Sequence, residues 1–400
     1  MGRATGRWRL FAVFTLLFLL LAPVVQSEGD EYFPEPETAE GIGAGEHLLA
    51  RGRVLRVLSE EKVSSEIFGE PVLQQVVEVG ITSGKFKGKK WIVTNEQSNN
   101  PVFDIRVKQG DAVVLYIDVT DGEIRDVFIS DYLRQPYIYA LVLLFIVLLL
   151  AIGWRQGLKT MAALFLTLVL VWGVLLPGFL HGYNPLLVTV LVSVLATAVT
   201  MVVVGGFSLK SLAAICGTLC GVLVAGLLAL SVGKLAHLTG FGNEEAAMLL
   251  YIPQKANLDI QGLLFAGIII GALGAAMDVS MSIASAVYEL KCVNPQLTVG
   301  ELIRSGLNVG RDILGTMANT LILAYTGSSL QLILVFMAYL ESILKIINLD
   351  MVASEIVRAF AGSIGMVAVI PLTAVVSSLL FGRYGGDFAC QDTTGKGDFP

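Results

Sequence analysis

Two kinds of hydrophobic pattern divide the chain. Between residues 47 and 134, apolar and polar positions alternate with a period of two in short segments rich in β-branched residues. Turn-forming runs such as SGKFKG, KQGD and TDG separate these segments. The segments are 48–58, 74–82, 89–96, 111–119 and 123–130. The pattern predicts about five strands, hence a small β-barrel of the OB or SH3-like kind, with a plain β-sandwich as the alternative.

From residue 135 to residue 382 the pattern changes to long apolar runs. A helix needs about 20 mostly apolar residues to cross a bilayer. About eight transmembrane helices are therefore expected, at 135–153, 159–177, 185–205, 211–232, 260–288, 308–327, 329–347 and 358–382. Polar residues interrupt the sixth of these spans, and residues 383–400 form a polar tail.

The first 27 residues have the pattern of a signal peptide, with an uncleaved signal anchor as the alternative. Arg3, Arg7 and Arg9 precede the apolar run 10–22, and small residues lie just before Glu28. Either segment places residue 28 onward outside the cytoplasm. Residues 28–46 are acidic and contain prolines and glycines, which is typical of a linker. The predicted extracytoplasmic domain is therefore 28–134, and the polytopic domain is 135–382.

Basic residues are unevenly distributed over the predicted loops and span ends. If residues 28–134 lie outside the membrane, the basic residues predicted on the inner side are Arg155, Lys159, Lys210, Lys291, Arg304, Arg311, Lys345 and Arg358. The outer loops contain Lys234 and Lys255, and the tail contains Arg383 and Lys396. This bias follows the positive-inside rule and predicts a multi-pass protein of the cell (cytoplasmic) membrane. Eight spans would leave the C-terminus outside the cell membrane, and an odd number of spans would place the C-terminus inside.

Composition supports the membrane assignment. Hydrophobic residues make up 55% of the chain and charged residues 15%, against about 25% charged in soluble domains. The net charge of −6 provides no basic face for nucleic acid. Cys216 and Cys220 lie four residues apart on one face of an apolar helix, where small packing residues are expected rather than metal ligands.

A polar stripe is predicted on the fifth span. Asp278, Ser282, Ser285 and Glu289 are spaced by four, three and four residues, which places them on one helix face. Gly267, Gly271 and Gly274 precede them with the spacing that lets a neighbouring helix approach closely. These three glycines are predicted helix-packing positions.

A second stripe is predicted on the sixth span. It consists of Asn308, Asp312, Thr316 and Asn319, with Arg311 beside it, and Glu341, Glu355 and Arg358 follow further along the chain. Two interpretations compete. Asp278 forms a structural ion pair with Arg311 or Arg304, or the two stripes line a cavity for an ion, proton or small polar solute. Ionisable groups inside membranes are usually functional, which favours the cavity.

The same residues carry a resemblance to a known family. The region from residue 271 to residue 330 resembles the signature of the YibE/F-like family of bacterial membrane proteins. It reads GALGAAMDVSMSIASAVYEL, followed by NPQLT and SGLNVGRDILGTMANTLILAYTGSSL. The upstream sequence also resembles this family, in the segments ARGRVLRVL, QQVVEVGITSGKFKGKKWIVTNE and VKQGDAVVLYID. The similarity covers roughly residues 47–382. It implies a multi-pass membrane protein with an N-terminal extracytoplasmic domain, and it implies no substrate.

No enzyme is expected. HExxH, GxSxG and Walker A motifs are absent from the sequence, and no metal or cofactor is predicted. The function expected is a secondary transporter or permease, whose partners are the lipid bilayer and a small solute or ion. The alternative is a membrane-anchored scaffold, or an assembly or regulatory protein, whose outer β-domain binds a partner. A homo-oligomer or a partner membrane protein is compatible with either function.

Overall fold

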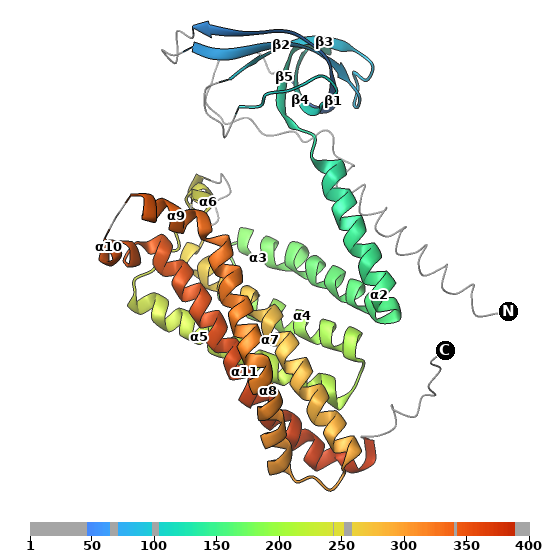
Figure 1. Cartoon of the computed structure of the whole chain (residues 1–400), viewed down its shortest axis with the longest axis vertical. Helices are drawn as coiled ribbons and strands as arrows, with labels where there is room; N and C mark the ends of the chain where they lie inside the picture. Colours follow the sequence, from blue (N-terminus) through green and yellow to red (C-terminus); the bar gives the residue numbers. More distant parts are fainter. Residues whose placement is uncertain are drawn as a thin grey trace, which may run out of the picture. The chain divides into compact units, whose positions relative to one another are not determined.

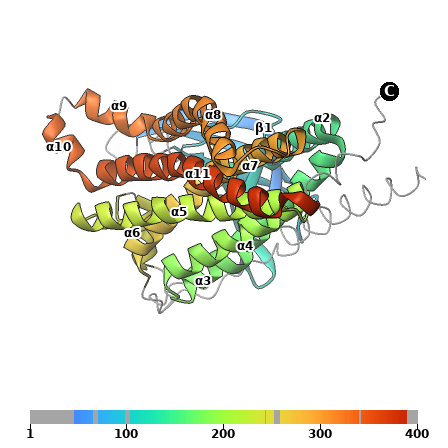
Figure 2. The same ribbon diagram turned by 90° about the horizontal axis from the view of Figure 1, so that it is seen from below.

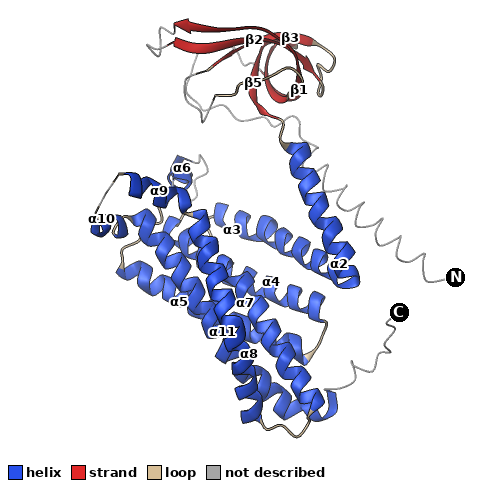
Figure 3. Ribbon diagram, in the orientation of Figure 1, coloured by secondary structure: helices blue, strands red, loops and turns tan. Residues whose placement is uncertain are grey.

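The computed structural model divides the chain into two compact units, Met1–Phe145 and Ile146–Pro400. It describes residues 46–64, 71–97, 104–242, 244–251, 258–339 and 342–388. The first unit holds all the described strands and the second is helical (Figures 1 and 3). The predicted signal segment 1–27, the linker up to residue 45 and tail residues 389–400 lie outside the described residues.

The first unit is a curled five-stranded antiparallel sheet with the strand order β3-β2-β1-β4-β5. Its strands are β1 (Glu46–Ser64), β2 (Pro71–Ile81), β3 (Lys90–Glu96), β4 (Ala112–Thr120) and β5 (Glu123–Tyr132). The five predicted strands are thereby confirmed. In β4 every second residue is buried, which is the period-two alternation of a strand with one covered face. Irregularities after Val54 and after Val57 shift the pairing of β1 with β2, which helps this long strand to bend.

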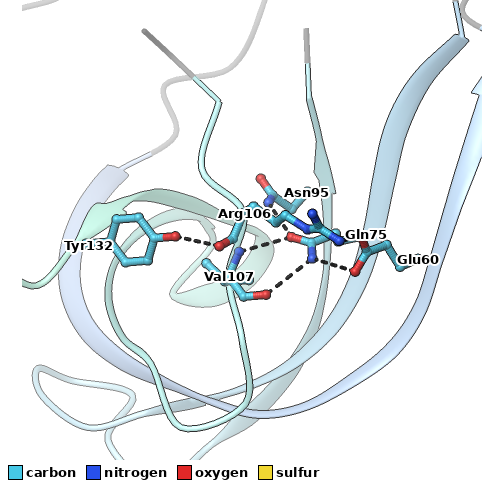
Figure 4. Close-up of polar contacts among 6 residues, drawn as sticks. All are labelled: Glu60, Gln75, Asn95, Arg106, Val107 and Tyr132. Atoms are coloured by element: carbon cyan, nitrogen blue, oxygen red, sulfur yellow. Dashed lines mark hydrogen bonds and ion pairs between the residues drawn. The ribbon is translucent and has the colours of Figure 1, made fainter. Parts of the chain in front are cut away.

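A buried glutamine fastens the segment before β4 to the sheet (Figure 4). The side chain of Gln75 is buried; it donates to the carbonyl oxygen of Val107 at 3.2 Å and accepts from the Val107 amide at 3.1 Å. Arg106 forms an ion pair with Glu60, and the Tyr132 hydroxyl donates to the Arg106 carbonyl at 2.5 Å. Buried polar groups need such partners, so this network holds the chain between β3 and β4 in one conformation.

The second unit is a bundle of long apolar helices. The elements are α2 (Gln135–Leu170), η1 (Val171–Leu175), α3 (Leu176–Leu180), α4 (Pro185–Gly205), α5 (Leu209–Leu235), α6 (Glu244–Met248), η2 (Leu249–Tyr251), α7 (Ile260–Val293), α8 (Val299–Ser328), α9 (Leu330–Ala338), α10 (Ile343–Ile347) and α11 (Asp350–Phe388). Five helical stretches are long and apolar enough to cross a membrane, or six when the bent pair α8 and α9 counts as one span. The chain is therefore a membrane protein, and the expected number of eight crossings is not confirmed.

The first stretch, Gln135–Leu180, is longer than one crossing requires. Its 46 residues would measure about 69 Å as one straight helix, roughly twice the hydrocarbon thickness of a bilayer. Trp154 interrupts it with φ 46° and ψ −120°, a backbone conformation outside the helical region. The interruption falls between the predicted spans 135–153 and 159–177.

The seventh predicted span, 329–347, is not a continuous helix. The chain bends by 59° between α8 and α9, and α9 contains nine residues, or about 14 Å. Residues 340–341, which follow α9, lie outside the description, and α10 has only five residues. Gly327, Ser328 and Ser329 stand at the bend, where the predicted sixth span ends and the seventh begins. Glycine and serine are weaker helix formers than alanine or leucine, which favours a helix end here. The apolar pattern did not predict that the segment after this boundary is short and bent.

The core of the bundle is built by α5, α7 and α11, and α11 packs between α5 and α8 (Figure 2). Small residues let α5 and α11 approach closely. A Cβ added to Gly365 would lie 2.5 Å from the Cβ of Ala225 and 3.0 Å from the carbonyl oxygen of Gly221. The hydroxyls of Thr218 and Ser280 hydrogen-bond to each other at 2.5 Å across α5 and α7.

The bend changes which basic residues share an end of the bundle. The start of α8 meets the last turns of α11, because a Cβ on Gly382 would touch Val299. At the opposite end, Thr239 donates its amide and hydroxyl to Asp350 at 3.0 and 2.8 Å. We call these the α7–α8 loop end and the α10–α11 end. Lys345 lies at the α10–α11 end, and Lys291 lies at the α7–α8 loop end, although eight spans would place them on one side.

Labelling with a membrane-impermeant thiol reagent tests this correction. In a chain whose four native cysteines are changed to serine, Lys345→Cys and Gln296→Cys should react from opposite faces of the membrane. Both positions are exposed and lie outside the long helices, so the reagent can reach them once it is on their side. Reaction of both from the same face would restore the eight-span topology and contradict the fold described here.

Candidate functional site

The predicted stripe on α7 lies on the face turned away from the core. Asp278, Ser282 and Glu289 are exposed and Ser285 is partly buried, while Ser280 and Ile283 on the opposite face are fully buried. The Ser282 hydroxyl donates to the backbone carbonyl of Asp278 at 2.8 Å. The four stripe residues therefore share one face as expected, but none of the described helices of the second unit covers it.

The stripe on α8 is also exposed. Its residues all point away from the contacts that α8 makes with α7 and α11; they are Asn308, Arg311, Asp312, Thr316 and Asn319. Arg311 donates to the Asn308 side chain at 3.3 Å, and Thr316 donates to the Ile313 carbonyl at 2.9 Å. Within the described part of the chain Asp278 forms no ion pair with Arg304 or Arg311. The binding role of both stripes stays a prediction.

The three glycines of α7 differ in their surroundings. A Cβ on Gly271 would lie 2.8 Å from the hydroxyl oxygen of Tyr325 on α8, so this position does allow a close approach. A Cβ on Gly267 or Gly274 would meet no described atom within 4 Å. Their predicted packing role would therefore need a neighbour from outside the described helices.

A different polar cluster lies where α8 breaks. Ser329 occupies the break, and its hydroxyl is 3.5 Å from a carboxylate oxygen of Glu355 on α11. The other oxygen of Glu355 accepts from the guanidinium of Arg358 at 2.7 Å. The side chains of Arg358 and Glu355 are 32% and 27% exposed, so this ion pair is partly shielded from its surroundings.

Several polar atoms of this cluster are buried without a hydrogen-bond partner among the described residues. They are the hydroxyl of Ser354, the Nε of Arg358 and the hydroxyl of Tyr325. Ser354 is only 4% exposed. An unsatisfied buried donor or acceptor costs about 1–3 kcal/mol, so each of these atoms would gain from a water molecule or a bound polar group.

A cavity adjoins these atoms. It has a volume of about 410 Å³ and is lined by Ser329, Ser354, Glu355 and Arg358 together with Glu245 and apolar residues. A second, mostly apolar cavity of about 730 Å³ shares Ser329, Leu332 and Glu355 with it and reaches Tyr325. The helix break, the ion pair and the unsatisfied Ser354 hydroxyl therefore line one cavity at the α10–α11 end, and Tyr325 lines the neighbouring cavity. We call these residues, with Tyr325, the break site.

The chemistry available at the break site is polar binding. Arg358 and the hydroxyls can donate hydrogen bonds, and Glu355 and the hydroxyls can accept them. The break site thus offers both charges to a small solute. Sequence reasoning had noted Glu355 and Arg358 but had placed them after a seventh span, and it missed Ser329, Ser354 and Tyr325. The run Gly327-Ser328-Ser329, at the boundary predicted between the sixth and seventh spans, is the sequence signal of the break.

The comparisons with known proteins agree with the resemblance seen in the sequence. The family model described as YibE/F-like protein matches residues 141–383, and the model described as YibE/F family N-terminal domain matches residues 51–132. No curated protein and no solved structure matches the chain. The two family matches cover both described units. The chain therefore belongs to the YibE/F-like family.

Proposed function

We propose that the chain is a secondary transporter or permease for an ion or small polar solute, and that the solute binds at the break site. The observation that carries this proposal is the helix break at Ser329, which contacts Glu355 of the Glu355–Arg358 ion pair and lines the same cavity as the unsatisfied buried hydroxyl of Ser354. The earlier prediction placed the solute on the stripes of α7 and α8. The break site supports it better because its polar groups adjoin a cavity.

A broken helix suits this function for a physical reason. Inside a bilayer, backbone polar groups that leave the helical pattern are tolerated only where protein or a water-filled cavity surrounds them. Known transporters use the ends of discontinuous helices to bind ions and charged groups. The break between α8 and α9 exposes such an end beside Ser329 and Glu355. The expectation that the chain is not an enzyme is retained in this proposal.

The sidedness proposed follows from charge. More basic residues lie at the α7–α8 loop end than at the α10–α11 end. The first group is Arg155, Lys159, Lys210, Lys291, Arg304 and Arg383, and the second is Lys234, Lys345 and Arg358. The positive-inside rule then supports a cytoplasmic α7–α8 loop end in the cell membrane. The break site would open toward the extracytoplasmic side, and the C-terminus would be cytoplasmic. The N-terminal β-domain remains extracytoplasmic in this proposal.

A second candidate function, the scaffold, is supported by one observation on the β-domain. Tyr116 on β4 pairs with Leu49 on β1 on one side and with Phe128 on β5 on the other. All three side chains are exposed. Adjacent exposed apolar side chains of this kind often mark a binding surface. The strand order, with β3 and β5 at the two edges of a curled sheet, is compatible with the OB-type barrel proposed for this domain.

The contents of cells distinguish the two functions. Total ion and small-solute contents are compared between cells that lack the protein, cells that contain it, and cells with residues 28–134 fused to one unrelated transmembrane helix. Transport predicts a solute whose content changes with the full chain and not with the fusion. Restoration of the wild-type state by the fusion would replace the transporter proposal with the scaffold.

A further inference from the structure

The exposed stripes of α7 and α8 present charges where the second unit should meet lipid. Asp278 and Glu289 are exposed on α7, and Arg304, Arg311 and Asp312 are exposed on α8. No ion pair within the described part of the chain involves any of these five residues. Ionisable side chains within membrane spans almost always pair or face a polar interior. Something outside the described bundle should therefore cover this face.

The positions of the charges along the two helices match. The α7–α8 loop joins the helices, so depth can be counted from it. Asp278 lies 15 residues before the end of α7 and Arg311 lies 12 residues after the start of α8, or about 22 and 18 Å from the loop. Glu289 and Arg304 lie four and five residues from the loop, or about 6 and 8 Å. Each acid on α7 thus has an arginine at a similar depth on α8.

This match of depths is what a pairing between two copies of the chain requires. Among the described residues of one chain the two stripes point away from the bundle and form no ion pair with each other, whereas two copies related by a two-fold axis along the membrane normal keep equal depths. The apolar stretch 136–153 of α2 contains no charged residue, and neither does α4, so these segments offer no partner for Asp278 or Arg311. Gly267 and Gly274, which are open within the chain, leave room for a helix of the second copy to approach.

We propose that the α7–α8 face binds a second copy of this chain in a two-fold symmetric dimer. Asp278 of each copy pairs with the partner's Arg311, and Glu289 pairs with the partner's Arg304. The proposal does not depend on transport, because the break site lies at the α10–α11 end and shares no residue with these pairs.

Charge reversal tests the pairing in full-length protein. Two differently tagged copies are co-expressed, extracted in detergent and purified through one tag, and the amount of the other copy is measured. Wild-type copies should co-purify. Two Asp278→Arg copies, or two Arg311→Asp copies, should lose at least about tenfold of the co-purified partner, because like charges then face each other. One copy of each variant should associate as wild type does, since both pairs are restored with one reversed.

The mixed pair keeps the test decisive even when a single variant folds poorly, because only a specific pairing lets two defective copies rescue each other. Lys234→Glu reverses an exposed charge at the opposite end of the bundle and should leave co-purification unchanged. A wild-type protein with the mass of one 42.8 kDa chain in detergent would overturn the proposal. Association that survives the single reversals, or that the mixed pair does not restore, would also overturn it and indicate a different occupant.

Discussion

Gly365→Ala is expected to destabilise the bundle by about 3 kcal/mol, at the upper end of the range for overpacked cores. The new methyl group would lie 2.5 Å from the Cβ of Ala225 and 3.0 Å from the backbone carbonyl oxygen of Gly221. Neither atom can move by a side-chain rotation, so α5 and α11 must separate. Because these two helices hold the bundle together, the midpoint temperature at which the protein loses its monodisperse peak in detergent should fall by several degrees.

Gly300→Ala is the matched control for this substitution. A Cβ at Gly300 on α8 would meet no atom within 4 Å, and alanine favours a helix by about 1 kcal/mol over glycine. The control should therefore be neutral or slightly stabilising. Equal midpoints for the two variants would mean that α5 and α11 are further apart than described.

Arg358→Gln is expected to abolish solute transport while folded protein remains. Glutamine can still donate hydrogen bonds, but it removes the positive charge that faces Glu355 and the cavity. Because the two side chains are 32% and 27% exposed, the stability lost should be far below the about 3–5 kcal/mol of a fully buried pair. The measurement is the change in cellular solute content, normalised to folded protein. A decrease of at least about tenfold is expected.

Two further variants distinguish transport from structure at the break site. Arg134→Gln removes the arginine of another pair with i,i+3 spacing, Asp131–Arg134 in the β-domain, and should leave transport intact. The double variant Glu355→Gln/Arg358→Gln leaves no unpaired charge. If the double variant has the wild-type amount of folded protein and the wild-type transport, the ion pair is only structural and the solute binds elsewhere. If folded protein is present and transport remains absent, the break site is supported.

The β-domain was predictable from the sequence because its pattern is local. In β4, Val113, Leu115, Ile117 and Val119 alternate with more exposed residues, and the same alternation decides which face is buried. The turn sequences at 83–88 and 120–122 separate the strands where the structure has turns. The role of Gln75 was not predictable, because its partner Val107 is distant in the sequence.

The polar stripes show how far helix periodicity extends. Spacing placed Asp278, Ser282, Ser285 and Glu289 on one face of α7 because a helix turns by a constant angle per residue. Periodicity cannot say what that face contacts. The structure turns it outward, because the opposite face carries Ser280, Ile283 and Val287, which pack into the core.

The sequence by itself determined the membrane character, the family, the five strands and the composition of each helix face, because these depend on local hydrophobicity and spacing. The sequence also predicts a boundary between two apolar segments at residue 328. Only the tertiary structure decided that the second segment bends by 59° and does not cross back, and therefore that Lys345 lies at the opposite end of the bundle from Lys291. It also brought Ser329 and Glu355, 26 residues apart, to the same cavity. Apolar runs look alike in sequence whether or not they cross a membrane, because the course of each run depends on contacts with helices that are distant in the sequence, such as those of α8 with α11.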